Sequence, residues 1–217
     1  MLHCSPMKTR QYFSVRTRLF ALITVLIPGL APAASIEFRV TDASGAPLQD
    51  VAVYATPRQS LPPRPRREFI IEQVRRQFAP LVSVIQTGTA VNFPNRDDVR
   101  HHVYSFSPAK TFEIKLYVGT PAKPVVFDKP GEVVLGCNIH DQMRGFVLVV
   151  DTPFVAKTDA AGTAVVDDLP AGEFDIGVWH YAQSAAAPLR RVRIADAAAR
   201  LPAGFTLQLR PGQVLPR

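Results

Sequence analysis

The residues that decide the fold read Cys137-Asn138-Ile139-His140-Asp141-Gln142-Met143. Apolar, β-branched segments lie on both sides, at 132–136 and 145–150, and they predict two strands. Gly136 and Gly145 bracket the stretch and permit tight backbone paths. The pattern therefore predicts a loop in which a cysteine ends one strand, a histidine occupies the turn and a methionine begins the return strand.

Residues 1 to about 33 have the features of a secretory signal peptide. Four basic side chains precede an apolar run over 19–30, which is too short to span a bilayer as a helix. Ala31-Pro32-Ala33 resembles a cleavage site, and an uncleaved membrane anchor is the alternative. Cleavage predicts an exported, periplasmic protein without a stable membrane span.

The remaining chain is nearly balanced in charge. It keeps 21 of the 25 basic side chains against 18 acidic ones, which is no nucleic-acid footprint. The overall composition, 47% hydrophobic and 20% charged, is ordinary for a soluble globular protein. Residues 57–67 concentrate proline and arginine and predict an extended linker, with a docking patch for an acidic partner as the alternative.

Cysteine and methionine usage both point to the quoted loop. Without the leader, the chain keeps one cysteine, Cys137, and one methionine, Met143. A lone thiol in an oxidising compartment is a liability unless it is buried, pairs between chains or binds a metal. Two histidines, a cysteine and a weak axial methionine form the blue-copper electron-transfer site. The loop therefore predicts one mononuclear copper ion held by Cys137, His140, Met143 and a further histidine.

The fourth ligand must come from elsewhere in the chain. Outside the loop and the leader, the candidates are His101, His102 and His180. The first two follow a polar turn at 95–98 and begin a strand rich in β-branched and aromatic residues. Side chains alternate between the faces of a strand, so only one of the two adjacent histidines can face the metal. Alternation does not choose between them.

These motifs resemble the cupredoxins of the plastocyanin and amicyanin group. The segment 93–106 reads FPNRDDVRHHVYSF, and C-x-x-H-x-x-M follows about thirty residues later with a loop length like that of amicyanin. The nearest likeness is to proteobacterial cupredoxin-like proteins often labelled methylamine-utilisation proteins, over roughly residues 68–180. The resemblance implies His101 as the fourth ligand, since cupredoxins typically read H-N-V where this chain has a second histidine. Related sequences commonly have an aromatic residue just before the methionine, where this chain has Gln142. A polar side chain at this position implies that water has more access to the edge of the copper site.

The predicted fold class is all-β, with a cupredoxin Greek-key β-sandwich over residues 68–152. Short strands with turn signals between them support a sandwich. A short helix over 67–78 is an alternative, because Ile70, Ile71, Val74 and Phe78 share a helical face. The predicted strands are Phe69–Gln73, Leu81–Gln86, Thr89–Phe93, His101–Phe106, Thr111–Tyr117, Lys123–Phe127, Glu132–Cys137 and Gly145–Val150, with Phe112, Ile114 and Leu116 facing inward.

A second small β-sandwich is predicted from residues 34–56 and 153–217. The order of their motifs resembles the carboxypeptidase-regulatory-like, transthyretin-like sandwich. We hypothesise that the cupredoxin region is inserted into this sandwich; separate N-terminal and C-terminal pieces are the alternative. Trp179-His180 is read as core packing with a surface imidazole, or as a second metal or docking site.

The predicted function is one-electron transfer between a protein donor and a protein acceptor of unknown identity. His140 is the expected electron port, with Ile139, Pro153 and Phe154 as docking surface. The chain is not expected to be an enzyme, because it has no phosphate loop, nucleophile elbow or haem-binding motif, and Asp97-Asp98 is read as a turn. The alternatives are a non-redox copper carrier, a structural β-sandwich protein of the periplasm, or a degenerate cupredoxin without metal.

Overall fold

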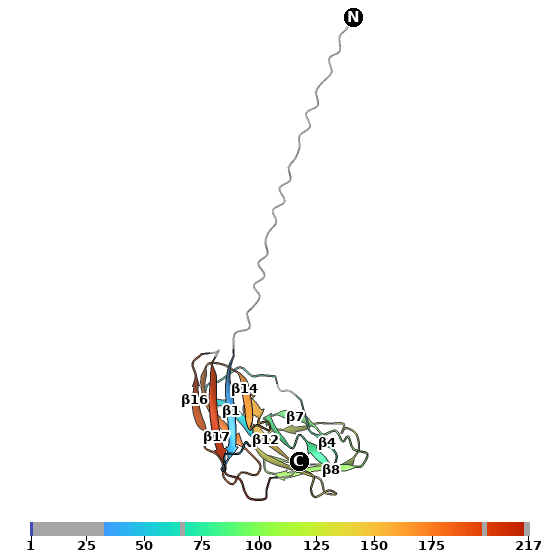
Figure 1. The fold of residues 1–217 in the computed structure, drawn as a ribbon. Coiled ribbons are helices and arrows are strands. Elements are labelled where there is room, and N and C mark those ends of the chain that lie inside the picture. The colour runs from blue at the N-terminus through green and yellow to red at the C-terminus, as the bar shows by residue number, and fades with distance from the viewer. Residues whose placement is uncertain (2–32, 66–67, 197–198, 215–217) are drawn as a thin grey trace. The chain divides into compact units, whose positions relative to one another are not determined.

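The computed structural model describes residues 1, 33–65, 68–196 and 199–214, and these residues form strands and no helix. The predicted all-β class is therefore confirmed. From residue 33 onward, the described residues lie within one compact unit (Figure 1). The predicted leader falls almost wholly on residues 2–32, outside the described residues, and stays a prediction. No helix in the described part is long and apolar enough to cross a membrane.

The first β-sandwich is built from the segment 68–152. Its larger sheet has the strand order β6-β12-β11-β8-β9, and a smaller sheet has the order β10-β7-β3, while β4 and β5 form a hairpin. In the larger sheet, β12 runs parallel to β6 and the other neighbours are antiparallel. The strands are β3 (Phe69–Ile70), β4 (Glu72–Val74), β5 (Gln77–Ala79), β6 (Val82–Gln86), β7 (Thr89–Asn92), β8 (His101–Ser107), β9 (Lys110–Tyr117), β10 (Val125–Phe127), β11 (Gly131–Gly136) and β12 (Arg144–Val150).

The core of this sandwich follows from the period-two alternation of its strands. On β11, Val133 and Leu135 are buried and Val134 between them is exposed. Cys137 and Met143, which directly follow β11 and precede β12, belong to the same buried cluster. The remaining buried members are Ile71, Phe78, Ile85, Val91, Phe93, Val103, Phe127, Val147 and Val149. The loop therefore adds its two sulfur side chains to an apolar core.

The inward alternation predicted for β9 breaks at Leu116, which is exposed, while Tyr117 packs against the core. The register between β9 and β8 shifts at this point, which marks a β-bulge. An extra residue in one strand turns the following side chains to the other face. The prediction for Leu116 was wrong for this reason, and Tyr117 is the register partner of His101.

The alternative helix over 67–78 does not form in the described residues, which begin again at residue 68. The segment builds β3 and the β4–β5 hairpin instead. Arg75 and Arg76 both have positive φ, 53° and 58°, and they form the tight turn of this hairpin. The helical spacing of apolar residues coincided with three short strands and their connections, which bury Ile71 and Phe78 and leave Ile70 exposed.

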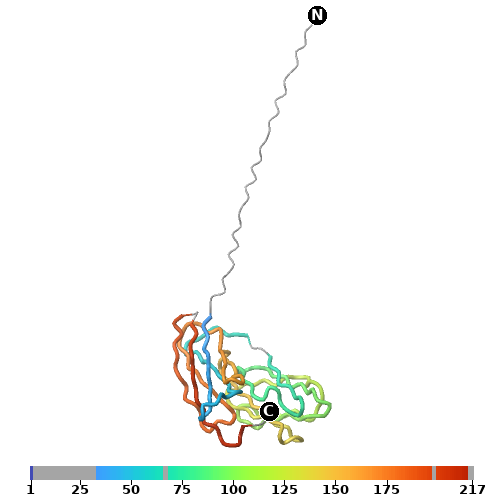
Figure 2. Tube along the Cα trace, in the orientation of Figure 1, coloured from blue at the N-terminus to red at the C-terminus, as the bar shows by residue number. Residues whose placement is uncertain are grey.

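The second β-sandwich joins strands from both ends of the described chain. Its sheets have the orders β14-β1-β17 and β13-β2-β15-β16. The blue segment and the orange-to-red segments of Figure 2 therefore lie side by side. The strands are β1 (Ala34–Asp42), β2 (Ala52–Pro57), β13 (Val155–Lys157), β14 (Thr163–Leu169), β15 (Gly172–Trp179), β16 (Arg190–Ile194) and β17 (Arg200–Leu207).

The two N-terminal strands thus pair with strands that follow residue 152. β1 pairs with β14 and β17, and β2 pairs with β13 and β15. An apolar core of aliphatic and aromatic side chains, including Phe38, Phe154 and Phe174, fills this sandwich. On this basis we propose that the first sandwich is inserted into the second, with boundaries near residues 56 and 153.

A third buried cluster joins the two sandwiches and contains Trp179, Val82 and Leu148. Beside it, the rings of Phe146 and Tyr181 stack with centroids 4.2 Å apart. His180, for which a surface imidazole was one prediction, is 2% exposed, and its Nδ1 accepts a hydrogen bond from the backbone N–H of Ala182. That prediction was wrong, because the strand end carrying His180 is covered at this junction.

Candidate metal centre

The loop 137–143 is closed by the strand pair that flanks it. β11 and β12 pair up to Gly136 and Arg144, which lie opposite each other. Within the loop, the backbone N–H of Met143 donates a 2.8 Å hydrogen bond to the carbonyl oxygen of His140. This turn brings the loop's first and last residues close together. As a result the side chains of Cys137 and Met143, 3% and 1% exposed, both enter the core.

Gly136 is required at the start of the loop by a close approach. A Cβ at this position would lie 2.7 Å from Cζ of Tyr104, which crosses it from β8. A Cβ does not approach a ring carbon that closely in folded proteins, so any larger residue at position 136 would displace either the Tyr104 ring or the strand. The glycine therefore lets β8, which carries the histidines, pair closely with β11, which leads into Cys137.

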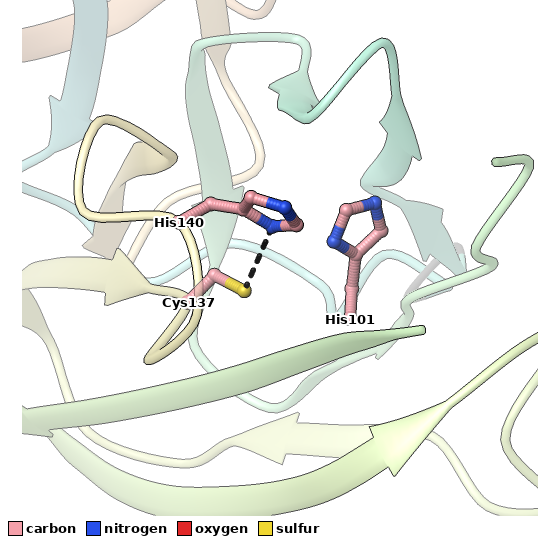
Figure 3. A group of neighbouring side chains, drawn as sticks. All are labelled: His101, Cys137 and His140. Atoms are coloured by element: carbon pink, nitrogen blue, oxygen red, sulfur yellow. Dashed lines mark hydrogen bonds between the residues drawn. The ribbon is translucent and has the colours of Figure 1, made fainter. Parts of the chain in front are cut away.

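Three ligand atoms converge between β8 and the loop, as Figure 3 shows. One ring nitrogen of His101, one of His140 and the sulfur of Cys137 all lie within 4.8 Å of one another. Sγ of Cys137 is 3.8 Å from Nδ1 of His140, and the two imidazole rings meet edge to face with centroids 5.0 Å apart. His101 is fully buried and His140 is half-buried.

The two ring nitrogens of His101 have different surroundings. Nε2 lies 2.7 Å from Oδ2 of Asp97. Nδ1 is buried and has no hydrogen-bond partner among the described residues. A buried nitrogen without a partner is costly unless something else satisfies it. Metal-bound histidines typically donate their other N–H to a carboxylate, so this arrangement fits a metal at Nδ1.

His102 points to the opposite face of β8. Its Nε2 lies 2.9 Å from Oε1 of Glu113, and its ring packs against Tyr104 with centroids 5.4 Å apart. It is absent from the group formed by His101, Cys137 and His140. The sequence did not show which of the two adjacent histidines faces the loop. In the structure His101 faces the loop and His102 faces away from it.

Asp97 was predicted to be a turn residue, and its contact with His101 was missed. The backbone N–H groups of Arg75 and Arg76 donate to its two carboxylate oxygens, at 2.7 and 2.9 Å. The i, i+4 spacing of an aspartate before a histidine was a possible signal, but the hairpin that holds the aspartate is distant in sequence.

Burial acts on the pKa of Asp97 more strongly than any other single influence, and it raises that pKa. The hydrogen bonds from Arg76, His101 and Arg75 together outweigh burial and lower the pKa of Asp97 below its usual value. The carboxylate beside the buried imidazole is therefore held in its charged form.

The donor set suits copper. A thiolate and a thioether are soft ligands, and imidazole accommodates both oxidation states of copper. Met143, the remaining member of the predicted set, lies in the same buried cluster as Cys137. Of the other histidine candidates, His102 faces away from the loop and His180 also lies outside the converging group. The residues present therefore fit a copper ion.

Around the site, the loop presents an exposed rim. Asn138, Ile139, Asp141 and Gln142 are exposed, with Ile139 at 48%. Phe154, which was predicted to belong to a docking surface, is instead buried in the core of the second sandwich. That prediction was wrong, because the residues that follow β12 cross into the second sandwich.

No family model matches the sequence, and no curated relative is found. Among solved structures, a Cu-containing nitrite reductase from Thermus scotoductus SA-01 is 27% identical over 43% of this chain, with a TM-score of 0.37. A reduced amicyanin variant is 19% identical over 45%, with a TM-score of 0.35. A purple cupredoxin from Nitrosopumilus maritimus is 25% identical over 37%, with a TM-score of 0.33.

The extents of these matches differ. They cover 24% of the nitrite reductase chain, 99% of amicyanin and 96% of the purple cupredoxin. The present chain therefore spans about a quarter of the nitrite reductase it matches. Amicyanin and a cupredoxin are thus among the structures that the chain resembles, as its motifs indicated. The likeness of the second sandwich to a transthyretin-like module stays a prediction.

Proposed function

We propose that this chain is a periplasmic type 1 copper protein that carries single electrons between a protein donor and a protein acceptor. One copper ion would be held by His101, Cys137, His140 and Met143. The observation that supports this most directly is the convergence of the His101, Cys137 and His140 ligand atoms within 4.8 Å. The bound ion would supply a couple between Cu(I) and Cu(II).

The buried ligands support electron transfer over the other copper-binding roles. His101, Cys137 and Met143 are at most 3% exposed. Ligands packed in a dense core keep their positions when the charge of the site changes, because protein interiors deform little. A copper carrier instead has to pass its ion to a partner through accessible ligands. We therefore favour an electron carrier over a carrier of copper.

His140 is the proposed ligand nearest to solvent, and it marks the side where a partner would dock. Its ring is half-buried, and the adjacent Ile139 is exposed. An apolar residue beside a half-buried ligand can be covered by a partner without burying an unpaired charge. The proposed docking area is therefore the rim formed by Asn138, Ile139 and the edge of His140.

The test is a titration of the processed protein with Cu(II), followed by visible absorption. The expected result is an intense thiolate-to-copper charge-transfer band that saturates at one copper per chain. Cys137→Ser should lose this band, because a serine hydroxyl provides no thiolate. A colourless wild-type protein, or a band that survives the substitution, would contradict the proposal.

A further inference from the structure

We propose that Asp97 positions His101 as a ligand and makes the site favour Cu(II) over Cu(I), a role that rests on the proposed copper site. Asp97 does not belong to the converging ligand group. It acts on that group through a single contact with the ring of His101.

The first step is the orientation of the imidazole. His101 Nε2 lies 2.7 Å from Oδ2 of Asp97, and the side chains are 0% and 13% exposed. A carboxylate accepts hydrogen bonds, so the proton of the neutral ring lies on Nε2. Nδ1 then keeps its lone pair, and it is this nitrogen that is buried without a partner. Asp97 therefore selects the tautomer that presents Nδ1 to the metal.

The second step is that Asp97 is itself fixed. Both of its oxygens accept backbone N–H groups from the Arg75–Arg76 turn, at 2.7 and 2.9 Å. Its own N–H donates to Oδ1 of Asn95. The amide nitrogen of Asn95 in turn donates to the carbonyl oxygens of Val99 and Tyr117. The carboxylate is thus held by a hairpin and a braced turn, and it cannot rotate away from His101 without breaking these bonds.

The third step is the effect of the charge. A carboxylate hydrogen-bonded to a ligating imidazole raises the basicity of that ligand. The additional negative charge near the metal favours the more positive ion, because the attraction between charges grows with the charge of the ion. Removing such an outer partner typically weakens metal binding by about 10- to 100-fold. We expect the loss to be larger for Cu(II) than for Cu(I).

The neighbouring histidine offers a matched control. Oε1 of Glu113 lies 2.9 Å from Nε2 of His102, so the same chemical pair occurs one residue along the strand. His102 lies outside the converging group, and Glu113 is 56% exposed. Neutralising Glu113 therefore removes a carboxylate–histidine contact of similar length that does not lead to the proposed copper site.

The experiment compares Asp97→Asn with Glu113→Gln in the processed protein. Affinities for Cu(II) and Cu(I) are measured by competition with chelators of known affinity. For Asp97→Asn, the ratio of Cu(II) to Cu(I) affinity should fall about tenfold, which corresponds to a rise in reduction potential of about 59 mV for one electron. For Glu113→Gln, the ratio should change less than about twofold. An unchanged ratio in Asp97→Asn would overturn the proposal.

A second measurement covers the case in which Asp97→Asn does not fold. In the metal-free wild-type protein, ¹⁵N chemical shifts of the His101 ring at neutral pH should show Nε2 protonated and Nδ1 unprotonated. A proton on Nδ1 would contradict the positioning role. If wild-type protein gives no charge-transfer band with Cu(II), the proposed function fails instead, and the ring tautomer still reports separately on Asp97.

Discussion

The two β-sandwiches differ in what their buried polar side chains do. The second has an apolar core around Phe38, and its buried Thr158 bonds to backbone groups of the same sandwich. The first buries polar side chains beside its apolar core, among them His101, Asn95 and Gln73. Burying polar groups costs free energy unless they are paired. The comparison teaches that the first sandwich places a buried polar group, His101, in a candidate site, while in the second Thr158 links backbone segments of the scaffold.

The largest expected effect is on copper binding, and it should differ between substitutions of the two adjacent histidines of the first sandwich. His101→Ala should remove a ligand and abolish the charge-transfer band, with a loss of Cu(II) affinity beyond the roughly 100-fold seen for outer partners. His102→Ala removes a ring on the other face of β8 and should leave the band intact. Both are checked by titration with Cu(II). Loss of the band in His102→Ala alone would reverse the assignment.

The next effect tests the scaffold role of the second sandwich. Phe174 is fully buried, and its ring meets Phe154 edge to face with centroids 5.7 Å apart. Phe174→Ala should lower the free energy of unfolding by about 3–5 kcal/mol, because it leaves a cavity in a dense core. Chemical denaturation measures this loss. The copper spectrum of the folded fraction should not change; a shifted band would show that the scaffold shapes the site.

A smaller effect concerns stability in alkali. Burial, the largest influence, raises the pKa of Tyr117 to about 12, with a further rise from nearby Cys137 and an opposing hydrogen bond from Gln73. The unfolded chain ionises this tyrosine near pH 10. Protonated Tyr117 therefore contributes fully to the free energy of unfolding below pH 10, and this contribution is lost as the pH rises toward 12.

Tyr117→Phe should make the alkaline decline of metal-free protein shallower between pH 10 and 12. Denaturation curves across this range measure it. Burial also raises the pKa of Tyr54, in β2 of the second sandwich. Tyr54 packs against the cluster between the two sandwiches, and Tyr54→Phe should likewise make the decline shallower. An alkaline decline that is identical in wild type and Tyr117→Phe would exclude this tyrosine as its source.

The smallest effect is expected from cutting the linker that precedes the first sandwich. If the first sandwich is inserted, limited proteolysis within 57–67 should leave the fragments associated, because β2 stays paired with β13 and β15. Size-exclusion chromatography and the copper band should be nearly unchanged. Fragments that separate without denaturant would contradict the insertion.

The sequence by itself determined the local features. The loop 137–143 and the strands around it were predictable, because alternation, glycines and turn residues act over a few positions. β8, β11 and β12 were placed to within one residue at each end. The donors predicted in the loop also rest on spacing, since a strand, a short loop and a return strand bring its residues together.

The tertiary structure decided which of the two histidines faces the loop and which carboxylate supports it. The facing of β8 depends on its pairing with β11 and β9, where a bulge shifts the register. The Arg75–Arg76 turn reaches Asp97 across more than twenty residues of chain. Phe154 is buried in the core of the second sandwich, and His180 is buried next to Trp179, which belongs to the cluster between the sandwiches. These outcomes depend on contacts between segments distant in sequence, and local patterns contain no record of such contacts.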